Sequence, residues 1–142
     1  SREVHMDIEE RVNQILEDVP TVLGVEQTEF RGERQILIVE SATYFSAGYR
    51  PSDADPTPLS QAYVELRGAP SPSSDVTRGY IRFVPANQIR KPQYSAKNKL
   101  INLWVDQQSI SLTLEQMNHS QRWLWFGEFA GGHIYSDLHS IP

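Results

Sequence analysis

Apolar residues recur at helical spacing near the start of the chain. Between residues 6 and 19 they follow one another at steps of four, three, one and three, which places them in a single stripe along a helix. The stripe consists of Ile8, Val12, Ile15, Leu16 and Val19. Pro20 cannot continue the pattern. The sequence therefore predicts an N-terminal helix whose apolar stripe faces a core.

Alternation of apolar and polar residues takes over after this helix and predicts half-buried strands. A glycine-containing turn at 31–33 is expected to join the first two strands into a hairpin, and Gly131 and Gly132 are expected to join the last two. Residues 85–99 are expected to hold one helical turn. Residues 110–117 suit a strand or a helix, and the strand interpretation is preferred because Ile110, Leu112 and Leu114 alternate. The expected strands are 21–30, 34–45, 61–68, 79–84, 99–106, 110–117, 122–129 and 133–140.

Two segments rich in proline and serine, 46–60 and 69–77, interrupt the strands and are expected to be long loops. The pattern as a whole predicts an α+β fold. In this fold an N-terminal helix packs on a largely antiparallel sheet of about six to eight strands, with two long Pro/Ser-rich loops. At 142 residues, the chain is expected to form a single globular domain over residues 1–142.

Composition narrows the class of protein. No apolar run approaches the roughly 20 residues that span a bilayer, so no membrane segment is expected. The absence of cysteine excludes disulfides, thiolate metal sites and cysteine nucleophiles, and is compatible with a cytoplasmic protein. The net charge of −5 is unevenly distributed: residues 1–40 carry ten acidic and four basic residues, whereas residues 78–99 carry six basic residues and no acidic one. Such polarity steers association rather than folding.

The basic segment 78–99 is a candidate site for a nucleic acid or another polyanion. Lysine and arginine can hold phosphates, and aromatic rings can stack on bases. The candidate binding residues are Arg90, Lys91, Tyr94, Lys97 and Lys99. A solvated charged loop is the competing interpretation, because the chain is acidic overall and lacks nucleic-acid recognition motifs.

The run 122–129 places Trp123 and Trp125 on one strand face and Leu124 and Phe126 on the other. A strand buried on both sides explains such a run most simply. Otherwise one face exposes an aromatic patch, and tryptophan is enriched where proteins bind one another. Trp123 and Trp125 are therefore candidate binding residues.

The last strand carries a candidate metal site. Alternation places His133, Asp137 and His139 on one face, and a histidine with a carboxylate suits zinc or ferrous iron. Asp137 and His139 can reach one ion, but His133 lies about 20 Å from His139 along a straight strand. A further ligand would have to come from His119, Glu128 or the 46–60 loop. A polar strand face without metal is the preferred interpretation.

No complete catalytic motif is present, so no catalytic residue and no cofactor are expected. The favoured function is a small non-enzymatic binding or accessory protein that engages a macromolecular partner, expected to be another protein. Two alternatives remain: a nucleic-acid or polyanion binder acting through residues 78–99, and a metal-dependent enzyme centred on Asp137 and His139. The sequence carries no signal for an oligomeric state.

Overall fold

The computed structural model of the protein describes residues 30–49, 53–54 and 59–142. These residues build one seven-stranded sheet with the strand order β4-β5-β3-β2-β1-β6-β7. Neighbouring strands are antiparallel except β3 and β5, which run parallel. The strands are β1 (Phe30–Tyr49), β2 (Leu59–Pro70), β3 (Arg78–Val84), β4 (Gln93–Ser95), β5 (Leu100–Asp106), β6 (Gln121–Phe129) and β7 (Ile134–Ile141).

The expected α+β class is wrong for the described part of the chain, which is mainly β. Its helical elements are short: α2 (Ile110–Gln116) and the 3-10 helices η1 (Ala86–Gln88), η2 (Gln107–Ser109) and η3 (Ala130–Gly132). The helix expected at residues 6–19 and most of the strand expected at 21–30 lie outside the described residues. None of the described helices is long and apolar enough to cross a membrane.

Residues 110–116 form a helix, so the strand expected there is wrong. Their core contacts follow helical spacing: Ile110 packs against the core, Thr113 is 6% exposed and Met117 is 7% exposed. Leu112 and Leu114, which suggested alternation, are instead exposed. Asp106 assists the entry to this region because its side chain accepts a hydrogen bond from the Gln108 amide at 2.9 Å.

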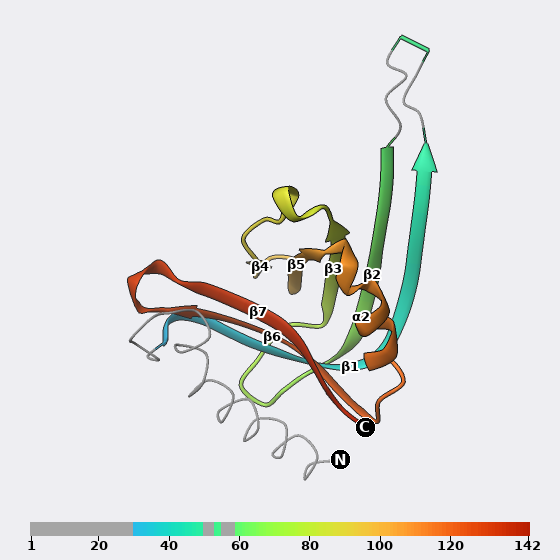
Figure 1. The fold of residues 1–142 in the computed structure, drawn as a ribbon. Helices are drawn as coiled ribbons and strands as arrows, with labels where there is room; N and C mark the ends of the chain where they lie inside the picture. The colour runs from blue at the N-terminus through green and yellow to red at the C-terminus, as the bar shows by residue number, and fades with distance from the viewer. Residues whose placement is uncertain (1–29, 50–52, 55–58) are drawn as a thin grey trace.

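The turn expected at 31–33 is also wrong, because β1 continues through these residues, with a register shift against β6 between Phe30 and Arg34. This strand is 20 residues long and serves two neighbours: residues 30–38 pair with β6, and residues 37–49 pair with β2. A register shift between Val39 and Ser41 leaves Glu40 as an extra residue. Such a bulge bends a strand. Figure 1 shows the result, with the first half of β1 beside β6 and the second half turned along β2.

The sheet has two faces with different packing. We call the face covered by α2 the inner face, and it carries the larger core, which includes Leu37, Leu66, Ile81 and Phe126. The opposite, outer face carries a smaller buried cluster of Ile36, Trp123, Trp125 and Phe129. Both faces of β6 are therefore buried, which confirms the interpretation of 122–129 as a strand with two-sided burial.

Several local predictions are confirmed. Strands are present at 61–68, 79–84 and 99–106, within or close to the bounds of β2, β3 and β5. The one helical turn expected within 85–99 is η1. β6 and β7 form the expected antiparallel hairpin, in which Gly131 and Gly132 both have a φ of 81°. Positive φ at both positions explains why the turn uses glycine.

The two Pro/Ser-rich loops are shorter than expected, because β1 continues to Tyr49, β2 begins at Leu59 and β2 continues to Pro70. Residues 71–77 connect β2 to β3 and are fastened to β1. The buried Gln35 side chain accepts hydrogen bonds from the amides of Asp75 and Val76 at 2.7 and 3.0 Å. The Ser74 hydroxyl accepts one from the Ile36 amide at 2.9 Å. This loop is therefore a structural connection with its polar groups satisfied.

Candidate functional site

A row of rings and arginines crosses four strands on the outer face. The registers align Phe45 of β1 with Tyr63 of β2, Tyr63 with Arg82 of β3, and Arg82 with Trp104 of β5. Phe45 is 41% exposed, and the other three side chains are partly exposed. We call Phe45, Tyr63, Arg82 and Trp104 the outer row. Directly opposed residues on adjacent antiparallel strands have side chains close enough to touch, which applies to Phe45, Tyr63 and Arg82, and the parallel pairing of β3 with β5 places Trp104 next in line.

The side chains of the outer row contact one another and their neighbours. The rings of Phe45 and Tyr63 stack at a centroid distance of 4.6 Å, and Tyr80 meets Tyr63 edge-on at 5.5 Å. The guanidinium of Arg82 lies 5.6 Å from the Tyr63 ring centroid and 4.9 Å from that of Tyr80. These ring contacts restrict the rotamers of exposed side chains and so pre-organise the surface.

Beside the outer row the surface is hollowed, with a volume of about 530 Å³. Arg90 reaches this hollow from the segment after η1, and its guanidinium lies 5.8 Å from the centroid of Trp104. No carboxylate from the described residues lines the hollow. Its lining includes two arginines, two partly exposed aromatic residues, the buried Phe83 and four residues with carboxamide side chains. The arginines, partly exposed aromatic residues and carboxamide residues are Arg82, Arg90, Tyr63, Trp104, Gln61, Gln88, Gln93 and Asn102.

The arginines in and near the hollow differ in whether a carboxylate pairs with them. Arg67 forms an ion pair with Glu65 at 2.8 Å. By contrast, no carboxylate in the described part of the chain lies within ion-pair distance of Arg78, Arg82 or Arg90. Arg82 instead donates a 3.4 Å hydrogen bond to the Asn102 side chain. This part of the outer face therefore presents positive charge that its described neighbours leave unneutralised.

The basic residues singled out from the sequence separate in the structure. Arg90 lies at the hollow, whereas Lys91, Lys97 and Lys99 are exposed and do not line it. Tyr94 turns away from this surface: it packs against the inner core, with its ring 6.1 Å from that of Phe126. Burial raises its pKa, and Glu33 and Asp75 raise it further. Tyr94 thus belongs to the packing of the sheet.

Trp123 and Trp125 are 1% and 2% exposed. Their rings lie inside the outer-face cluster, so neither tryptophan offers a ring to a partner in this structure. The exposed aromatic surface on the described residues comes instead from the β1–β2–β3–β5 side of the sheet.

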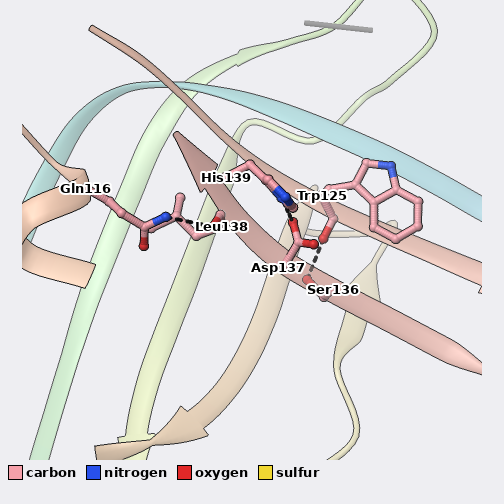
Figure 2. A network of polar contacts seen from close by, with 6 residues as sticks. All are labelled: Gln116, Trp125, Ser136, Asp137, Leu138 and His139. Atoms are coloured by element: carbon pink, nitrogen blue, oxygen red, sulfur yellow. Dashed lines mark hydrogen bonds and ion pairs between the residues drawn. The ribbon is translucent and has the colours of Figure 1, made fainter. Parts of the chain in front are cut away.

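β7 carries the residues considered as a metal site. Nδ1 of His139 lies 2.5 Å from Oδ1 of Asp137, and the His139 ring stacks on Trp123 at a centroid distance of 5.6 Å. Figure 2 shows this pair beside two structural bonds, from the Ser136 hydroxyl to the Trp125 carbonyl and from Gln116 to the Leu138 carbonyl. The pair and its stacking fix the orientation of the imidazole.

The structure brings Asp137 and His139 together but leaves His133 in the turn before β7, where it is exposed. Among the described residues, no three histidine or acidic side chains are grouped so that they could hold one ion. His119 contacts the Ser140 hydroxyl at 2.7 Å. Because side chains alternate along a strand, Ser140 and His139 point to opposite faces of β7, so this serine does not join the Asp137–His139 pair.

Tyr135 lies on the same face of β7 as Asp137. Burial raises the pKa of its hydroxyl, and the charge of Asp137 and a hydrogen bond to it raise the pKa further. The hydroxyl therefore stays protonated at neutral pH and is a poor general base there.

Sequence reasoning missed most of the site. Tyr63 and Trp104 lie opposite the core positions of two correctly predicted strands, so the alternation pattern placed them on an outward face. The pattern gave no register between strands that are about twenty residues apart in the chain. The face on which Phe45 lies could not be predicted from alternation either, because the extra residue at Glu40 reverses the alternation beyond the bulge.

Comparison of the chain with protein-family models, with curated proteins and with solved structures finds no match in any of the three. The functional argument therefore rests on the surface itself.

Proposed function

We propose that the protein is a non-enzymatic binding or accessory protein that engages a macromolecular partner through its outer row and the adjoining hollow. One observation carries the proposal: Phe45, Tyr63, Arg82 and Trp104 are aligned across four strands at a partly exposed surface. Tyrosine, tryptophan and arginine are the residues that contribute most to binding energy at interfaces. Their ring contacts reduce the entropy lost when a partner immobilises them.

The distribution of ionisable groups favours binding over chemistry. Catalytic acids and bases need a pKa near the working pH. The pKa values of Tyr94 and Tyr135 are instead moved further above neutral pH. A Ser–His–Asp arrangement does not form on β7, because Ser140 contacts His119 while Asp137 contacts His139. A metal-dependent activity at Asp137 and His139 has no third ligand to support it within the described residues.

We also propose that the protein acts in the cytoplasm. A chain without cysteine needs no oxidising compartment. The arginines of the outer row and the hollow have no carboxylate within ion-pair distance among the described residues, and they therefore favour a partner that carries negative charge.

The test compares partner capture by three immobilised proteins in lysate from the organism that encodes the chain. They are the wild type, a row variant carrying Tyr63→Ser and Arg82→Ser, and a control carrying Leu112→Ser. Leu112 is a suitable control because it is 62% exposed on α2, on the inner side of the sheet. Unfolding in urea checks that all three remain folded.

We expect one component to be retained by the wild type and the control, to be lost from the row variant, and to bind the purified wild type again once isolated. Removing two central contacts should weaken such a complex by about 2 to 4 kcal/mol. Capture of the same components by all three proteins would contradict the proposal, because the partner would then bind elsewhere.

A further inference from the structure

We infer that the ligand of the outer row and its hollow is a single-stranded nucleic acid. This inference rests on the proposed function and gives it a ligand class. It follows from three features of the same surface: arginines without an ion-pair partner in the described part of the chain, partly exposed rings, and carboxamides in a hollow that no described acidic residue lines.

The arginines supply the contacts to phosphate. Arg82 and Arg90 both line the hollow, and Arg78 lies four residues before Arg82 on the same strand face. None of the three has a carboxylate partner among the described residues. A guanidinium held over a ring still presents its N–H edge, which suits the oxygens of a phosphodiester. A chain of phosphates running past the hollow would meet these charges in succession.

The rings and amides supply the contacts to bases. Trp104 and Tyr63 lie on either side of Arg82 across the sheet, and adjacent strands are about 4.8 Å apart. A ring at each of these positions can stack on an unpaired base. The side chains of Gln61, Gln88, Gln93 and Asn102 offer both donors and acceptors in the hollow. Such groups match the polar edges of bases that are splayed out of a helix.

A single strand fits this surface better than a duplex. In a duplex the faces of the bases are stacked on one another, so flat rings on a sheet cannot reach them. Duplex binding would depend on charge alone, and the chain carries a net charge of −5. Arg78, Arg82 and Arg90, which lack an ion-pair partner among the described residues, gather on one part of the outer face, and such a local group favours a short contact with a flexible strand.

The experiment measures fluorescence anisotropy of labelled oligonucleotides of about 12 nucleotides, since single-strand sites of this kind span about 4 to 16. The probes are a mixed-sequence RNA, the DNA of the same sequence and the matching DNA duplex, with heparin as a competitor. Each is titrated with the full chain at several salt concentrations. We expect the single strands to bind at least tenfold more tightly than the duplex.

Two variants separate stacking from charge. Tyr63→Leu should weaken single-strand binding about fivefold to a hundredfold while leaving the salt dependence unchanged, because it removes a stacking ring but no charge. Tyr63→Phe keeps the ring and should bind like the wild type. Arg82→Gln with Arg90→Gln should lower the slope of log K against log salt by about 1.4, since each phosphate contact contributes about 0.7.

The control for charge is Lys97→Gln with Lys99→Asn, which removes the same charge from exposed residues outside the hollow. Asparagine is chosen at position 99 because Lys99 has a φ of 52°, which asparagine tolerates. The control should change affinity less than threefold. Its urea unfolding midpoint and those of the other variants establish that each protein is folded.

Three results would overturn the inference. They are no binding of either single strand at the lowest salt, tighter binding of the duplex, or equal binding of heparin with no effect of Tyr63→Leu. The last result would mean that the surface accepts any polyanion. If the row variant loses a protein partner from lysate while the single strands fail to bind, the proposed function stands and the nucleic-acid ligand is excluded. If single strands bind but no substitution in the outer row affects them, the inference fails because the strand binds elsewhere, and the proposed function is then decided by the capture experiment.

Discussion

At the scale of single residues, the buried side chain of Gln35 supplies a hydrogen-bond acceptor to backbone amides that have no strand partner. Beyond Pro70 the chain leaves the ladder with β1, and the amides of Asp75 and Val76 would be left without acceptors. The side-chain oxygen of Gln35 accepts from both, and its amide nitrogen donates to Glu33 at 3.0 Å. One side chain therefore satisfies a connection that would otherwise carry unpaired backbone groups.

Replacing Gln35 by leucine is expected to lower the free energy of unfolding by about 2 to 4 kcal/mol, because two backbone donors lose their acceptor in a buried place. Equilibrium unfolding in urea measures the change. Glu33→Gln alters only the exposed partner of Gln35 and should cost less than about 0.5 kcal/mol. A Gln35→Leu protein as stable as the wild type would mean that the loop finds other hydrogen bonds.

Tyr135 gives the protein a dependence on alkaline pH. An unfolded tyrosine ionises near pH 10. Burial, the charge of Asp137 and the hydrogen bond to it keep the pKa of the folded Tyr135 higher. As the pH rises above about 10, the unfolded state loses its proton while the folded state retains it, so the folded state becomes relatively less stable.

We therefore expect the wild type to lose stability faster than Tyr135→Phe above about pH 10, and the two to change in parallel below about pH 9. The difference should be about 1 kcal/mol per pH unit, somewhat under the full linkage slope because part of the ring keeps contact with solvent. Urea unfolding at a series of pH values measures it. Parallel curves up to pH 11 would show that the folded hydroxyl ionises at its ordinary pKa.

At the scale of elements, the bulge in β1 determines which side chains reach the outer face. Val39 lies on the inner face, and strict alternation would place Phe45 on the same face. The extra residue at Glu40 reverses the alternation, so Ala42 packs on the inner core and Phe45 aligns with Tyr63 outside. Gly68 lies opposite the bulge, where a Cβ would come within 1.8 Å of the Ile38 carbonyl oxygen. The bulge therefore needs glycine on the partner strand.

Gly68→Ala is expected to destabilise the protein by about 3 kcal/mol, because backbone atoms on β1 would have to move. Gly68→Ala protein that remains folded should also bind the ligand of the outer row more weakly, since the position of Phe45 depends on the bulge. Gly32→Ala is the control: its Cβ would meet side-chain atoms of Glu128 rather than backbone, the carboxylate can turn aside, and the Glu128 Cβ at 3.3 Å has to give only slightly. Urea unfolding compares the two, and equal stability of both variants would contradict the role of the bulge.

At the scale of the whole molecule, β1 joins parts of the sheet that are far apart in the chain. Ile36 pairs with Trp125 of β6, whereas Tyr44 pairs with Val64 of β2. The sheet is therefore complete only when β6 has paired with β1, and the paired residues Ile36 and Trp125 are nearly ninety positions apart in the chain. Non-local pairing of this kind requires costly loop closure before its contacts form.

Refolding from urea is expected to take about milliseconds to seconds, the range of β proteins dominated by non-local contacts. Stopped-flow tryptophan fluorescence measures it, because Trp123 and Trp125 are buried in the folded protein, where β6 pairs with β1 and β7. Refolding within microseconds would indicate that the C-terminal hairpin buries its tryptophans without β1.

The sequence by itself determined the local features of the described chain. The alternation in 61–68, 79–84 and 99–106, the double glycine of the last hairpin and the two-sided burial of 122–129 are all present in the structure. These features depend on neighbouring residues, whose spacing is fixed by the geometry of a strand.

Only the tertiary structure decided the fold class, the helix at 110–116, the passage of β1 through 31–33 and the outer row. Ile110, Thr113 and Met117 contact the inner core at helical spacing, and these contacts favour the helix. The alternating pattern that predicted a strand is equally visible in the sequence, so the sequence alone could not decide between the two. Phe45, Tyr63, Arg82 and Trp104 come from four strands, and their alignment depends on register and on one bulge. Register is set by pairing between distant segments, so no local pattern could place these four side chains together.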